Sequence, residues 1–188
     1  MIFDTHVHVG QFYNTYFSPQ MILNTCRQIG IHGIAVSSTT TCEENYDKVL
    51  NEMHELLAQD EIYVAPILWV MPDMFESQVI TKMLNSGIPW KCIKIHNYQQ
   101  QGRWGQSTGE KMKQVVDVAV QLQLPILIHT GNEFCYPNDY VPLIEKYPNQ
   151  LWLVLDGALE IKTEYTLTTN KNIPELKIAF IADSHIGT

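Results

Sequence analysis

Short apolar segments typical of β-strands recur roughly every thirty residues along this chain, and helical patterns separate the early ones. The segments begin near Ile2, Ile31, Ile62, Lys91, Pro125, Leu151 and Lys177. Strands that alternate with helices at this spacing are typical of βαβ units, which build parallel sheets. Several segments are apolar on both faces, as a sheet covered by helices requires. The pattern predicts an α/β fold, which an open doubly wound sheet and a (β/α) barrel both satisfy.

Helix start signals lie between the strand segments. Ser18 before Pro19 predicts an N-cap followed by proline at the first helical position, and Gly30 predicts the end of that helix. Three further pairs match a capping box: Thr41 with Glu44, Asp73 with Glu76, and Ser107 with Glu110. A shorter helix is expected from Asp139 to Tyr147.

Length and charge limit the classes of function. A chain of 188 residues predicts a single domain spanning 1–188. The formal net charge of −8 argues against a nucleic-acid surface, and the apolar runs are too short for a membrane span. The chain opens on a strand without a basic and then apolar leader, so a cytoplasmic location is expected. No glycine-rich nucleotide-binding motif follows any strand segment.

Polar residues gather at the ends of the predicted strands. They are His6 and His8, Lys94 and His96, His129, Asp156 and Asp183. In a parallel sheet all of these ends share one face, and in a barrel that face is a closed ring. Their convergence there predicts an active site that takes a small-molecule substrate.

His6 and His8 are two residues apart on the first predicted strand, so their side chains share a face and form half of a metal site. The alternative is a strand whose histidines satisfy local hydrogen bonds. Imidazole and carboxylate ligands suit zinc, and three protein ligands with an open water position make a hydrolytic site. His129 is the candidate third ligand, while Asp183 completes the site or takes the proton from the bound water. His96, with Lys94, faces the substrate or stabilises charge.

The motifs D-T-H-V-H-V-G (4–10), I-K-I-H (93–96), L-I-H-T-G (127–131) and I-A-D-S (181–184) resemble, in this order, the amidohydrolase superfamily. The chain is most similar to the amidohydrolase-related branch that includes aminocarboxymuconate semialdehyde decarboxylase and related hydrolases. The resemblance covers most of residues 1 to 150 and returns at 177 to 184. It implies a (β/α) barrel, hydrolysis or decarboxylation of a small polar substrate, and a divalent metal. The ligands it implies for that metal are His6, His8, His129 and Asp183.

Two features depart from the family pattern. The sixth strand ends on Asp156 before Gly157, where the family has a histidine, and a carboxylate cannot donate a proton as an imidazolium does. The chain is also shorter than the about 250 residues of a typical (β/α) barrel, so a barrel that is shortened or incomplete after the sixth strand is expected. The stretch from Tyr165 to Thr169 is a candidate seventh strand. A bare strand edge predicts a homo-oligomer.

Four residues are candidate substrate contacts: Lys94, Arg103, Asp156 and His185. Arg103 lies in a polar loop after the fourth strand and suits an anionic substrate, and His185 follows Asp183 by two residues. Lys94 either closes the barrel mouth or, once carboxylated, bridges two metals, and one metal is preferred. Asp156 faces the same predicted site.

The expected function is a zinc-dependent hydrolase acting on a small polar or carboxylate-bearing substrate through a metal-activated water. A catalytically degenerate binding or assembly protein, a metal-dependent decarboxylase and a metal-dependent phosphoesterase remain open alternatives.

Overall fold

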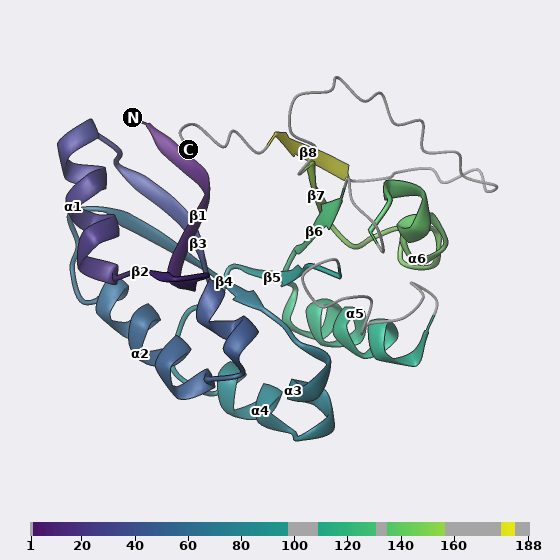
Figure 1. Ribbon diagram of the computed structural model, residues 1–188. Helices are drawn as coiled ribbons and strands as arrows, with labels where there is room; N and C mark the ends of the chain where they lie inside the picture. Colours follow the sequence, from purple (N-terminus) through teal and green to yellow (C-terminus); the bar gives the residue numbers. More distant parts are fainter. Residues whose placement is uncertain (1, 98–108, 131–134, 157–177, 183–188) are drawn as a thin grey trace. The chain divides into compact units, whose positions relative to one another are not determined.

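The computed structural model describes residues 2–97, 109–130, 135–156 and 178–182, with the backbone alone at 154–156 and 178–182 (Figure 1). The chain divides into two compact units, Met1–Cys92 and Ile93–Thr188. Each unit is an arrangement of parallel strands and helices, and each is described by itself.

The first unit holds a four-stranded sheet in the order β2-β1-β3-β4. Strands β1, β3 and β4 are parallel, while β2 pairs with β1 in the antiparallel direction. The strands are β1 (Phe3–Phe12), β2 (Thr15–Phe17), β3 (Gly33–Ser38) and β4 (Tyr63–Trp69). The helices are α1 (Pro19–Ile29), the 3-10 helix η1 (Thr39–Glu43), α2 (Tyr46–Leu57), α3 (Pro72–Glu76) and α4 (Val79–Leu84).

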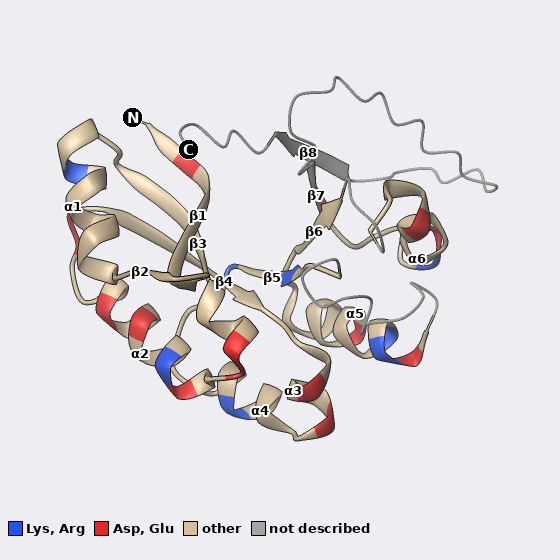
Figure 2. Cartoon of the chain, in the orientation of Figure 1, with Lys and Arg blue, Asp and Glu red and all other residues tan. Residues whose placement is uncertain are grey.

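Helix α2 packs on the first sheet and contacts β1, β3 and β4. Met53 and Leu56 on its inner face are fully buried, as are Ile34 and Val36 on β3. Charged residues lie mainly on the helices, and β3 and β4 carry none (Figure 2). The apolar contacts between α2 and the sheet therefore form the core of this unit.

The second unit holds four parallel strands in the order β5-β6-β7-β8. The strands are β5 (Cys92–Ile95), β6 (Ile126–Thr130), β7 (Trp152–Asp156) and β8 (Ile178–Ala182). The helices are α5 (Glu110–Leu122), the 3-10 helix η2 (Pro137–Tyr140) and α6 (Val141–Lys146). Helix α5 buries Met112, Val115, Val116 and Ala119 at helical spacing, so one face of α5 supplies much of this core.

The α/β class and the parallel strands expected from the sequence are confirmed. Within the described residues the strand order runs from β2 to β8, and these two end strands are not paired with each other. Closure of the sheet into a (β/α) barrel is therefore not shown. The expected start of α1 is confirmed, because the Ser18 side chain accepts a hydrogen bond from the Met21 amide at 3.2 Å. Its expected end is confirmed too, since Gly30 takes the left-handed conformation.

Two of the expected capping boxes are wrong. Thr41 lies inside η1, and Asn45 caps α2 by accepting from the Lys48 amide at 3.3 Å. Asp73 lies inside α3, whose N-cap is Met71. The single helix expected there is two short ones, α3 and α4, because Gln78 between them has φ of 59°.

The other helix predictions have mixed outcomes. Ser107 lies outside the described residues, and α5 begins at Glu110 after Gly109. The helix expected from Asp139 to Tyr147 is resolved into η2 and α6. The candidate strand at 165–169 also lies outside the described residues. None of the helices in the described part of the chain is long and apolar enough to cross a membrane.

Candidate functional site

His6 and His8 lie side by side on β1, as their spacing predicts. Their ring centroids are 4.6 Å apart and the rings meet edge to face at 75°. Both residues are half-buried. The register between β1 and β3 shifts between Asp4 and Val7, and the Asp4 carboxylate accepts a hydrogen bond from the His6 amide at 3.0 Å. This irregularity in the ladder bends β1 at His6 and so affects where the His6 side chain points.

Two residues that the sequence analysis did not single out surround His8. Ser37 on β3 is its partner in the parallel ladder, and the Ser37 Oγ lies 3.1 Å from Nδ1 of His8. The ring of Trp69, the last residue of β4, lies 5.9 Å from the His8 ring. The Ser37 hydroxyl can donate to Nδ1 of His8 or accept its proton, because the direction of this hydrogen bond depends on the histidine tautomer.

Strand β1 continues for four residues beyond His8, although the histidines were expected at its end. The last three of them, Gly10 to Phe12, pair with β2, whereas the parallel ladder with β3 stops at Val9 opposite Ser38. His8 therefore lies near the end of the parallel ladder but not at the end of the strand. The short strand β2 was not predicted.

A buried polar cluster lies under this end of the ladder. Glu52 on α2 is 2% exposed. Its carboxylate accepts hydrogen bonds from the hydroxyls of Ser38 at 2.5 Å and Thr40 at 2.8 Å. The sequence does carry a signal for the burial of Glu52, because this residue lies on the apolar face of α2 between Val49 and Leu56. A carboxylate on a buried helix face requires donors, and the hydroxyl-rich run after β3 supplies them.

The same buried polar cluster limits which residues could replace Gly10. Gly10 has φ of +100°, and a Cβ atom there would lie 2.3 Å from the Thr40 Oγ1. Nearby, burial raises the pKa of Tyr16 from 10.0 to about 12, and the negative charge of Glu52 adds to the effect.

In the second unit, the predicted residues of β5 and β6 lie together at the carboxyl ends of these strands. Lys94 is 0% exposed, and His96 and His129 are each 7% exposed. The two imidazoles are stacked, with centroids 3.7 Å apart and planes 16° from parallel. Asn97 and Thr130 beside them are also buried. Strands β5 and β6 thus bring polar side chains together at their carboxyl ends.

The remaining predicted residues are described in part or not at all. The backbone of Asp156 pairs with Thr130, one position beyond His129 in the ladder. Arg103, Asp183 and His185 lie outside the described residues. Among the side chains that are described, no three His, Cys, Asp or Glu stand together in a way that could hold a metal ion. Of the expected metal ligands, the structure therefore describes His6 and His8 in the first unit and His129 in the second.

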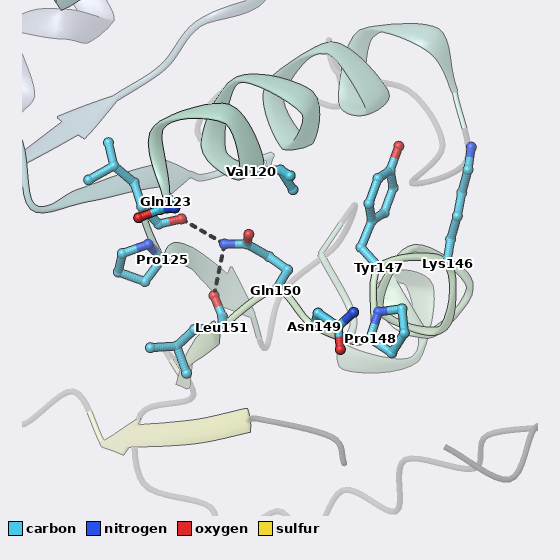
Figure 3. A pocket seen from close by; sticks show the side chains of 10 residues that line it. Val120, Gln123, Pro125, Lys146, Tyr147, Pro148, Asn149, Gln150 and Leu151 are labelled. Atoms are coloured by element: carbon cyan, nitrogen blue, oxygen red, sulfur yellow. Dashed lines mark hydrogen bonds between the residues drawn. The ribbon is translucent and has the colours of Figure 1, made fainter. Parts of the chain in front are cut away.

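The second unit also carries an open groove of about 440 Å³, at the amino-terminal ends of β6 and β7 (Figure 3). The Gln150 side chain spans its floor and donates to the carbonyls of Leu124 at 2.6 Å and Leu151 at 3.2 Å. Tyr147 and Lys146 from the end of α6 line one side. The predicted site residues are not among those that line this groove, which lies at the opposite strand ends from His129.

Comparison of the chain with protein-family models and with curated proteins yields no match. The assignment of an activity therefore depends on the residues themselves.

Proposed function

We propose that the protein is a metal-dependent hydrolase of the amidohydrolase type that acts on a small polar or carboxylate-bearing substrate. The observation that supports this most is the His6 and His8 pair on β1, with rings 4.6 Å apart and Ser37 at Nδ1 of His8. A serine that occupies one imidazole nitrogen is the arrangement that orients a histidine for metal binding through the other.

The donor set fits a zinc ion. Two half-buried imidazoles on one strand face supply neutral nitrogen ligands, and zinc is commonly bound by histidine and carboxylate. The expected third ligand is His129, a buried residue at the end of β6, and the expected fourth is Asp183. Three histidine ligands would leave the fourth position of a zinc site open for water, and Asp183 would either complete the set or take the proton from that water.

A bound zinc ion supplies Lewis-acid polarisation and a water with pKa lowered to about 7. The residues of the chain have separate tasks in this proposal. Asp183 accepts the proton, and Lys94 and His96 stabilise the negative charge that develops on the substrate. Arg103 orients a substrate carboxylate through paired hydrogen bonds, and Asp156 and His185 provide further polar contacts.

The proposal is tested by measuring zinc content and hydrolysis in the same preparations. The parent and His8→Ala are loaded with zinc and assayed on a panel of small amides, esters and N-acyl amino acids. His54→Ala, which alters an exposed histidine on α2, is the matched control. The parent and the control are expected to bind zinc and hydrolyse at least one substrate, and His8→Ala to lose both.

Different results distinguish the alternatives. Zinc binding without hydrolysis in the parent, followed by turnover in Asp156→His, would assign the loss of activity to Asp156 and favour a degenerate relative. Release of carbon dioxide from a carboxylated substrate would favour a decarboxylase. A parent that binds no divalent ion would refute the proposal.

A further inference from the structure

We propose that the groove at the amino-terminal ends of β6 and β7 is a second binding site, and that its ligand is a small aromatic carboxylate with a ring N–H group. The site belongs to the second unit alone and uses neither a metal nor any residue of the expected active site. The inference therefore goes beyond the proposed hydrolase and does not depend on it. Three features of the groove carry the inference: its size and lining, a fixed acceptor oxygen and a lysine at its rim.

The size and lining of the groove suit a small aromatic molecule. Its volume of about 440 Å³ lies within the range of about 300 to 1,000 Å³ that is usual for small-molecule sites. Val120, Leu124 and Leu151 supply apolar side chains, and Pro125 and Pro148 supply rings (Figure 3). A flat ring buries its faces well against such a lining, because aliphatic and ring carbons exclude water from both sides of it.

The wall that holds Tyr147 is tied in place by hydrogen bonds. The carbonyl of Tyr147 accepts the amide of Gln150 at 3.1 Å and the indole N–H of Trp152 at 3.4 Å. At the other end of the residue, the Tyr147 hydroxyl donates to the Asp117 carboxylate at 3.2 Å. Because these residues are already ordered, a ligand loses less free energy to ordering the wall when it binds.

The side chain of Gln150 presents an acceptor oxygen to the groove. Gln150 is 8% exposed, and its Nε2 donates to the carbonyls of Leu124 at 2.6 Å and Leu151 at 3.2 Å. Only the NH2 end of the amide can face two carbonyls, so Oε1 lies on the other side, away from both of them (Figure 3). Within the described part of the chain no group donates a hydrogen bond to this oxygen. Buried amide oxygens normally have a donor, and a ring N–H of the ligand would supply it.

The charge at the rim favours an anion. Lys146 is exposed and is the one charged residue among the described residues that line the groove. Its Nζ lies 5.6 Å from the centroid of the Tyr147 ring, so the ammonium group is on the side of the groove that Tyr147 forms. The nearest carboxylate on this side, Asp117, is already paired with Lys113 and with the Tyr147 hydroxyl. A ligand carboxylate therefore meets a positive charge there.

The first test compares three probes by calorimetric titration of the parent protein. Indoleacetate has the ring, the N–H group and the carboxylate, whereas naphthylacetate lacks the N–H group and indoleacetamide lacks the charge. One indoleacetate is expected to bind per chain. Naphthylacetate should bind roughly two- to tenfold more weakly, the effect of one hydrogen bond, and indoleacetamide roughly two- to fivefold more weakly, the effect of an exposed ion pair. Equal affinity for all three probes, or no saturable binding of indoleacetate at millimolar concentration, would overturn the inference.

The second test uses variants to show that indoleacetate binds in this groove. Val120→Trp fills the groove and should abolish binding, while Leu122→Trp, at an exposed residue of α5 outside the lining, is the matched control and should bind as the parent does. Lys146→Gln should lower the affinity for indoleacetate to that of indoleacetamide in the parent, and Lys91→Gln, at another exposed lysine, should leave it unchanged. Val120→Trp or Lys146→Gln proteins that bind as tightly as the parent would contradict the inference.

Nuclear magnetic resonance locates the probe without any substitution. The side-chain NH2 signals of Gln150 report on the acceptor oxygen of the same amide, so indoleacetate should shift them and naphthylacetate should shift them less. Signals that stay unchanged while indoleacetate binds would place it elsewhere and overturn the inference. Signals that move on dilution of the protein without any probe would show that a second copy of the chain covers the groove, which would overturn it as well.

Discussion

The two units use pairs of histidines in different ways. His6 and His8 lie on one strand, so the strand pleat fixes their separation, and both remain half-buried. His96 and His129 come from neighbouring strand ends, so the β5–β6 register brings them together, and both are 7% exposed. The first pair is partly exposed, while the second pair is part of a packed edge beside the buried Lys94.

The two histidine pairs give different kinds of evidence for a functional site. On β1, the Ser37 hydroxyl contacts Nδ1 of His8, and hydrogen bonds at one ring nitrogen are common in histidines that bind metals through the other. The stacked pair shows that polar residues gather where β5 and β6 end, without showing what they bind.

The largest loss of stability is expected from a substitution in the core of the second unit. Trp152 on β7 is fully buried, and Trp152→Ala should lower the free energy of unfolding by about 3 to 5 kcal/mol. Leu151→Ala, at a side chain that is 41% exposed, should cost less than about 1 kcal/mol. Urea unfolding measures both. Equal effects of the two changes would contradict the packing described here.

The next effect is expected in the first unit, at the turn of β1 over the Glu52 cluster. Gly10→Ala combines a positive φ with a contact at 2.3 Å and should cost about 2 to 3 kcal/mol. Gly30→Ala has a similar backbone conformation in open space, so it should cost about 1 kcal/mol. If thermal unfolding gave the same loss for both, the close approach of Thr40 to Gly10 would be wrong.

Removing one histidine from each pair compares the pairs directly. In the metal-free protein, His129→Ala deletes a buried stacked ring and should cost about 2 kcal/mol. His6→Ala deletes a half-buried ring and should cost less than about 1 kcal/mol. Chemical unfolding of the two variants tests this order, and a larger loss for His6→Ala would reverse the comparison.

The smallest effect concerns pH. A folded-state pKa of about 12 for Tyr16, against 10.0 for an exposed tyrosine, means that the folded protein holds this proton more tightly. The stabilisation is complete below pH 10.0 and is lost as the pH rises toward about 12. The parent should therefore lose stability in this interval relative to Tyr16→Phe. Parallel pH profiles of the two proteins would contradict the raised pKa of Tyr16.

The sequence predicts the alternation of strands and helices, the start of α1 and the shared face of His6 and His8, because each depends on local spacing. It does not predict the break at Gln78 or the cap at Asn45, since these depend on how the helices meet the sheet. Ser37 and Glu52 were also missed. Both take their roles from partners far away along the chain, which a pattern along one strand or one helix does not reveal.

The most direct test of the central claim is X-ray absorption spectroscopy of the zinc-loaded protein, with His6→Ala/His8→Ala as the reference. Stoichiometric zinc with at least two imidazole ligands is expected in the parent, at distances of about 2.0 to 2.1 Å. The double variant should bind no stoichiometric zinc. Absence of zinc from the parent, or an unchanged zinc environment in the double variant, would contradict the assignment of His6 and His8 as metal ligands.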